Sequence, residues 1–131
     1  MSRRKAVNAL LDTSVVIAGD LTLNRGDTTA ISVVTVGELR AGVLLASDPS
    51  VRAARQARLS AVRETYEPLL VDEAVAEHYG DVLAGAREAR RITTATDLII
   101  IATAAATGRS LYTLDERQGR LAEQLGVPTV Q

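Results

Sequence analysis

The sequence contains no cysteine, which excludes disulfide bonds, zinc–thiolate sites and thiol catalysis. Its one histidine, His78, would have to serve any Ser–His–Asp triad, and we interpret it as an ordinary, partly exposed residue on a helix. Phenylalanine and tryptophan are also missing, and only three residues are tyrosines. Hydrophobic residues still make up 47 % of the chain, which is typical of a folded domain. The core must therefore be built from leucine, valine, isoleucine and alanine.

Lysine is nearly absent as well, because Lys5 is the single lysine among 15 basic residues. A P-loop is therefore excluded, since its glycine-rich turn must carry a lysine. A receiver or HAD-type phosphotransfer domain also places aspartates at the rim of a doubly wound sheet. Such a domain needs a lysine late in the chain, so we rank it low. Arginine suits bidentate contacts with phosphate, although a GC-rich genome explains its excess equally well.

The apolar run near the start of the chain is neither a signal peptide nor a membrane span. Basic residues at 3–5 precede this run, Asn8 interrupts it and Asp12 ends it. We therefore expect a cytoplasmic protein whose partners do not include a membrane. A chain of 131 residues has the length of one domain with a proper core, so residues 1–131 are predicted to form a single domain.

The first predicted element is a buried strand that ends in a polar turn and passes into a helix. An apolar run over 7–11 ends at the triplet Asp12-Thr13-Ser14, and a second apolar run over 15–18 follows. Ligands bind outside the carboxyl ends of the strands in open parallel sheets, which is where Asp12 would stand. Asp, Ser and Thr are also favoured helix N-caps, so Asp12 taken alone could be only a cap.

The rest of the chain alternates between short apolar runs and amphipathic stretches. Strands are expected at 30–34, 69–71, 110–114 and 127–130, and helices from 35 to near 47 and over 50–66, 72–90, 93–107 and 116–125. Thr35 with Glu38, and Thr94 with Asp97, have the spacing of a capping box. Gly108 stands where a helix commonly ends in a left-handed residue. This alternation predicts an α/β fold with a parallel sheet covered by helices on both faces.

Four carboxylates fall at one rim of such a sheet. Asp12 and Asp115 end strands, whereas Glu38 and Asp97 lie in the first turns of helices, and both kinds of position open onto the same edge. Each acid could serve only a cap or a turn. Together they would repel one another unless a proton or a cation neutralised them. Oxygen ligands favour Mg²⁺ or Mn²⁺, which also bind phosphate oxygens, so the pattern indicates a metal site that acts on a phosphate ester.

These motifs resemble those of the PIN-domain nucleases and, among them, the VapC toxins of bacterial toxin–antitoxin pairs. The four stretches LLDTSVVIA, ISVVTVGELRAGV, ATDLIIIATAAATG and LYTLDE follow the family's order and cover nearly the whole chain. Thr96 stands where the family often has Asn or Asp before its third acid. The resemblance implies a three-layer α/β/α fold with five parallel strands in the order 3-2-1-4-5.

The resemblance also implies an endoribonuclease that cleaves tRNA or rRNA with Mg²⁺, for which Mn²⁺ can substitute. Asp12 and Asp97 would be the main metal ligands, and the other two acids would complete the site. Ser14 and Thr113 would support these ligands. The ion would activate a water molecule for in-line attack on the phosphodiester and stabilise the developing charge.

The partners that the resemblance implies are RNA, a second copy of the chain in a homodimer, and a VapB-type antitoxin. The antitoxin would wrap the helices around residues 36–66 and hold the toxin inactive. A catalytically silent PIN-like scaffold that binds RNA or a protein partner is the alternative. The four intact acids argue against this alternative, but only activity can decide.

Two groups of arginines fall on predicted helices. One lies along the helix over 50–66, where a solvated face is the default interpretation. The other gathers at the end of the helix over 72–90, where cations complement the helix dipole and where a rim that faces RNA is the alternative. The first group is Arg52, Arg55, Arg58 and Arg63, and the second is Arg87, Arg90 and Arg91.

Overall fold

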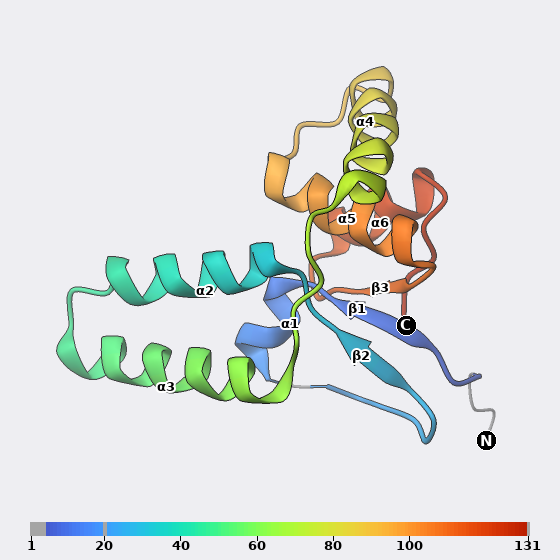
Figure 1. Cartoon of the computed structure of the whole chain (residues 1–131). Helices are drawn as coiled ribbons and strands as arrows, with labels where there is room; N and C mark the ends of the chain where they lie inside the picture. The colour runs from blue at the N-terminus through green and yellow to red at the C-terminus, as the bar shows by residue number, and fades with distance from the viewer. Residues whose placement is uncertain (1–4, 20, 131) are drawn as a thin grey trace.

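Strand β1 (Asn8–Leu11) lies at the centre of a three-stranded parallel sheet, between β2 (Thr28–Ala30) and β3 (Ser110–Tyr112) (Figure 1). The structure is a computed structural model that describes residues 5–19 and 21–130, so Arg3 and Arg4 of the basic start lie outside the described residues. Residues 9–11 are almost wholly buried. A central strand covered on both faces needs apolar side chains on both, which explains the unbroken apolar run.

The sheet has three strands rather than the expected five. The segments expected as outer strands each form one parallel bridge, from Leu69 to Ser32 and from Thr129 to Leu111. Pro68 and Pro128 precede these bridges and have no N–H to donate, which confines the segments to the sheet edges. The spatial order of the five segments follows the expected 3-2-1-4-5, but the outer two are single bridges and not strands.

Helices cover both faces of the sheet, as the alternation predicts. The helices are α1 (Thr13–Ala18), α2 (Val33–Leu45), α3 (Pro49–Thr65), α4 (Glu73–Glu88), α5 (Ala95–Thr107) and α6 (Glu116–Gln124). Leu10 packs into a core built with α4, α5 and α6, whereas Leu11 packs into a second core built with α1, α2 and α3. Figure 1 shows the α2–α3 hairpin extending away from the sheet. No helix within the described ranges is long and apolar enough to cross a membrane.

The start of α2 differs from the prediction. The strand expected at 30–34 is wrong, because β2 ends at Ala30 and the buried Ser32 caps α2 by accepting a hydrogen bond from the Val34 N–H at 3.0 Å. Thr35 is therefore inside the helix and is not a cap. Gly108, in contrast, does terminate α5 as predicted, in the left-handed conformation with φ of 65°.

The arginines of α3 are not simply a solvated face. Arg55 donates to the carbonyl of Gly42 at 2.8 Å, and Arg52 donates to the carbonyl of Leu44 at 3.0 Å. Both carbonyls lie in the last turn of α2, where they have no partner within the helix, and α2 has no basic residue of its own there. Two arginines of α3 thus cap the neighbouring helix and complement its dipole.

Replacing Arg55 with Met is expected to lower the free energy of unfolding by about 0.3–1 kcal/mol, because the α2 terminus loses a charged donor. Methionine keeps the long side chain and a similar helix propensity. Arg58→Met is the matched control, since the Arg58 side chain makes no hydrogen bond to another described residue. Urea unfolding of both variants tests this assignment, and equal losses in the two would contradict it.

Candidate active site

Asp12 is the most firmly held of the four predicted acids. It directly follows β1 and is only 5 % exposed. Its Oδ1 accepts a hydrogen bond from the Thr13 N–H at 2.7 Å, and its Oδ2 accepts one from the Thr113 hydroxyl at 2.6 Å. A buried carboxylate is tolerated when such donors replace water. Asp12 is also the N-cap of α1, so the cap and the site position coincide in one residue.

Ser14 and Thr113 lie against Asp12, as the resemblance implies. The Ser14 hydroxyl is 3.4 Å from Asp12 Oδ2, and it also accepts the Leu114 N–H at 3.2 Å. The Thr113 Oγ1 accepts the Asp115 N–H at 3.0 Å. The two hydroxyls therefore connect Asp12 to the turn that precedes Asp115.

Glu38 is linked to Asp12 and its neighbours by the hydroxyl groups of Thr13 and Thr35, two residues that the sequence pattern indicated as helix-capping residues. The Thr13 hydroxyl donates to Glu38 Oε1 at 2.8 Å and lies 2.9 Å from the hydroxyl of the buried Thr35. Because a hydroxyl has one proton, Thr35 must donate to Thr13 when Thr13 donates to Glu38. Glu38 lies in the second turn of α2 and not in its first turn as expected. Thr35 and Glu38, three residues apart, share one helix face, which is the signal that could have identified Thr35.

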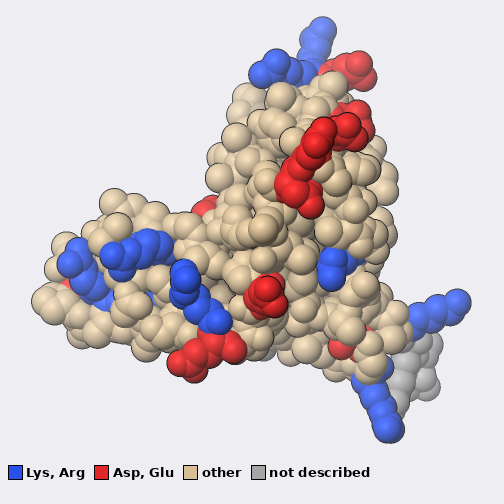
Figure 2. Space-filling view, in the orientation of Figure 1, with Lys and Arg blue, Asp and Glu red and all other residues tan. Residues whose placement is uncertain are grey.

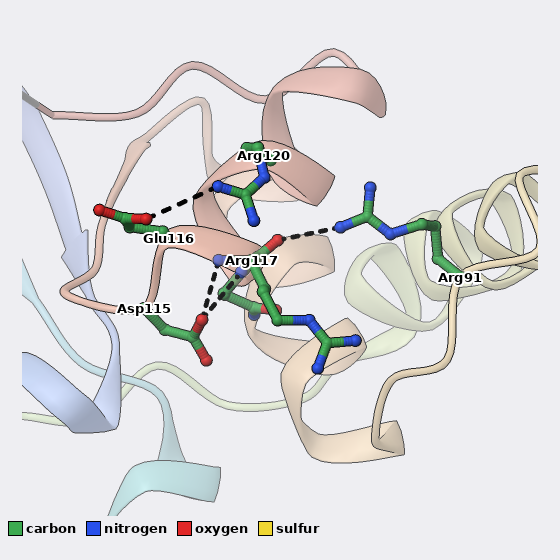
Figure 3. Close-up of polar contacts among 6 residues, drawn as sticks. Arg91, Asp115, Glu116, Arg117 and Arg120 are labelled. Atoms are coloured by element: carbon green, nitrogen blue, oxygen red, sulfur yellow. Dashed lines mark hydrogen bonds and ion pairs between the residues drawn. The ribbon is translucent and has the colours of Figure 1, made fainter.

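Asp97 and Asp115 enter from the starts of α5 and α6. The Thr94 hydroxyl accepts the Asp97 N–H at 3.2 Å, which is one half of the predicted capping box. Asp115 caps α6, since its Oδ1 accepts the N–H groups of Arg117 at 2.9 Å and Gln118 at 3.3 Å (Figure 3). The buried Gln118, which sequence analysis missed, donates from Nε2 to the Asp97 carbonyl at 2.9 Å. This bond joins the two helix starts.

Burial and the charges of the neighbouring acids affect the ionisation of Glu38 and Asp97. Burial raises the pKa of Glu38, and the Asp97 and Asp12 carboxylates raise it further, while the Thr13 hydroxyl lowers it. Burial also raises the pKa of Asp97, as do Asp12 and Asp115, while Thr94 lowers it. Glu38 and Asp97 thus resist ionisation first because they are partly buried and second because other carboxylates are close.

The donors at this edge fit a hard divalent cation in their chemistry, since all of them are oxygens. Among the described residues, however, no three carboxylates or histidines are already close enough to hold one ion together. Mg²⁺ commonly uses one or two carboxylates and keeps several waters, so two of these acids would suffice. The residues present therefore fit such an ion without forming a closed cage.

Three grooves border the acids. The first, of about 300 Å³, lies between the 91–94 loop and α6 and is bordered by Asp97 and Asp115. The second, of about 230 Å³, includes Glu38 and lies between α1 and the α2–α3 hairpin. The third, of about 240 Å³, lies on the other side of Asp115, along α6. A larger cavity of about 470 Å³ contains the half-buried His78 but none of the four acids.

Comparisons with known proteins agree with this fold. The model of the PIN domain family matches residues 9–124. The chain is 41 % identical to ribonuclease VapC4 of Mycobacterium tuberculosis over 112 residues, which cover 82 % of this chain and 85 % of VapC4. Ribonuclease VapC5 of the same organism is 37 % identical, with 82 % of each chain covered.

Solved structures also share this fold. The VapBC-5 toxin–antitoxin structure from Mycobacterium tuberculosis superposes with a TM-score of 0.79 and 32 % identity, covering 95 % of this chain and 99 % of that one. FitAcB from Neisseria gonorrhoeae superposes with a TM-score of 0.75 and 25 % identity, covering 94 % and 96 %.

In metal-free protein, Asp97→Asn is expected to raise the melting temperature, and the gap to wild type should widen as the pH rises. The raised pKa of Asp97 means that its stabilising contribution is complete below its ordinary pKa of 3.8 and is lost as the pH rises through the folded-state pKa. Asparagine cannot ionise and escapes this loss.

Melting curves in EDTA from about pH 3.5, near the ordinary pKa of an aspartate, to about pH 7 measure the gap. Asp81→Asn, which replaces an exposed acid on α4 outside the candidate site, is the control for the loss of one acidic side chain. An Asp97→Asn variant that melts lower at every pH would instead assign Asp97 to helix capping alone.

Proposed function

The chain belongs to the PIN-domain family, and we propose that it is a metal-dependent endoribonuclease toxin that cleaves tRNA or rRNA and is neutralised by a cognate VapB-type antitoxin. The observation that carries this proposal is the meeting of four carboxylates, from four separate parts of the chain, at one edge of the sheet. Burial, together with repulsion from the neighbouring carboxylates, raises the pKa of Glu38 and Asp97, as expected for a site that receives a cation. A toxin of this kind would act in the cytoplasm, where its RNA substrate is found.

Asp12 and Asp97 are the proposed main ligands for Mg²⁺ or Mn²⁺, with Glu38 and Asp115 completing the site. When bound, the ion would supply an activated water and stabilise the charge that develops on the phosphodiester. Asp12 contributes a fixed oxygen, because donors on both of its oxygens hold it. Asp115 keeps Oδ2 for the site, since its helix-capping bonds use Oδ1.

Glu38 is proposed to take a proton from the attacking water. Its Oε1 accepts the Thr13 hydroxyl, while Oε2 makes no hydrogen bond to another described residue. A carboxylate whose pKa is raised by burial and neighbouring charge is a stronger proton acceptor than an ordinary glutamate. Thr35, by donating to Thr13, keeps the Thr13 proton directed at Glu38.

The antitoxin is proposed to cover the α2–α3 hairpin. The hairpin exposes Leu44 and Leu45, the latter to 82 %, and Ile17 of α1 is exposed beside the groove that contains Glu38. Figure 2 shows basic side chains gathered over the same hairpin. A segment that buried these apolar residues would also close the groove over Glu38, which gives a physical route to inhibition. A homodimer, as in other members of the family, is also part of the proposal.

Purified protein free of antitoxin is expected to cleave RNA with Mg²⁺ or Mn²⁺ and to stop when EDTA is added. Asp12→Asn and Asp97→Asn should each abolish cleavage with an unchanged circular dichroism spectrum, because each removes a proposed ligand. Asp81→Asn, prepared in parallel, should cleave like wild type and controls for contaminating nuclease.

Cleavage that persists in both Asp12→Asn and Asp97→Asn would refute the assignment of the site. An inactive wild type that still binds RNA would favour the silent scaffold.

A further inference from the structure

We propose that the groove between the 91–94 loop and α6 binds the RNA phosphate next to the scissile bond, through the guanidinium of Arg117. The inference rests on the proposed ribonuclease function. The groove is about 300 Å³ and is lined by Arg91, Thr94, Asp97, Asp115 and Arg117, together with Ile92. It therefore joins two of the proposed metal-site acids to two arginines.

Arg91 is already committed to holding the groove in shape. One terminal nitrogen donates to Gln124 Oε1 at 3.1 Å. The other donates to the Arg117 carbonyl at 3.3 Å (Figure 3). These bonds join the loop to α6 across one wall of the groove. Arg91 is thus a positioning residue, whereas the sequence pattern offered either a cation that complements the helix dipole or, as the alternative, a rim that faces RNA.

The end of α4 is built to deliver Arg91 to α6. The Arg90 N–H donates to the Arg87 carbonyl at 3.0 Å, and the Arg91 N–H donates to the Ala86 carbonyl at 2.9 Å. This pair of bonds is a Schellman motif, in which the left-handed position is usually glycine. Here Arg90 occupies it with φ of 55° and is the non-glycine residue with positive φ among those described. Arg87 and Arg90 are exposed and do not line the groove.

Arg117 is the cation of the groove that is left available. Its side chain is exposed and makes no hydrogen bond or ion pair with another described residue. Its backbone N–H donates to Asp115 Oδ1, so its starting point is fixed relative to the acids. Figure 3 shows Asp115 and Arg117 on the same side of α6. An arginine in this position can make a bidentate contact with phosphate.

The groove on the other side of Asp115 is a poor competitor for the RNA backbone. It is lined by Asp115, Glu116 and Glu123 against a single arginine, Arg120, which is paired with Glu116 at 3.7 Å. The Arg117 groove has two arginines against two acids, and a cation bound to those acids would leave it positive. Charge therefore directs the strand along the Arg117 side.

Binding of a short fluorescently labelled single-stranded RNA tests the proposal, with Ca²⁺ in place of Mg²⁺ to neutralise the acids. Arg117→Gln is expected to weaken binding about tenfold, the value of one charged hydrogen bond. The slope of log Kd against log salt concentration should fall by about one. Arg117→Lys should keep the wild-type slope. Arg120→Gln is the matched control and should change neither quantity.

Arg117→Gln that binds like wild type, or Arg120→Gln that loses as much, would overturn the subsite while leaving the ribonuclease assignment intact. A wild type that neither binds nor cleaves RNA would overturn both. Thermal melting of the variants checks folding, which an exposed side chain without intramolecular bonds should not affect.

Discussion

A buried carboxylate at the end of the central strand is the constraint on which the rest of the site depends. Asp12 is tolerated there because the Thr13 N–H and the Thr113 hydroxyl replace its lost water. Those donors come from α1 and from the segment after β3, so satisfying one charge also fixes where the two elements sit. Thr13 then reaches Glu38 on α2. One buried acid thereby organises the edge at which all four acids meet.

The same residues serve the fold and the proposed site, so a capping role does not exclude the functional role that we propose for them. Asp12 caps α1 and Asp115 caps α6, yet each has an oxygen directed elsewhere. Glu38 and Asp97 destabilise the folded chain when they ionise, because burial and the neighbouring carboxylates raise their pKa values. Stability is given up at neutral pH in a way that a divalent cation would restore.

Much of this arrangement could be predicted from local patterns. The buried strand before Asp12, the cap at Thr94 and the end of α5 at Gly108 follow from neighbouring residues alone. The predicted cap of α2 was misplaced. Thr35 and Glu38 have the spacing of a capping box, but their side chains contact the Thr13 hydroxyl instead. The links made by Gln118, Arg52 and Arg55 join one helix to another, so they depend on how the helices pack and not on a spacing within one helix. The prediction of two outer strands was wrong, because the proline before each bridge has no N–H to donate and each segment forms only one bridge.

Anomalous diffraction from crystals grown with Mn²⁺ would locate the ion directly and test the proposed metal centre most closely. The account predicts an anomalous peak within coordination distance of Asp12 and Asp97 side-chain oxygens, with water completing the shell. It also predicts that the peak disappears in Asp97→Asn. Well-ordered crystals of active protein with no peak among the four acids, or with a peak only elsewhere, would contradict the account.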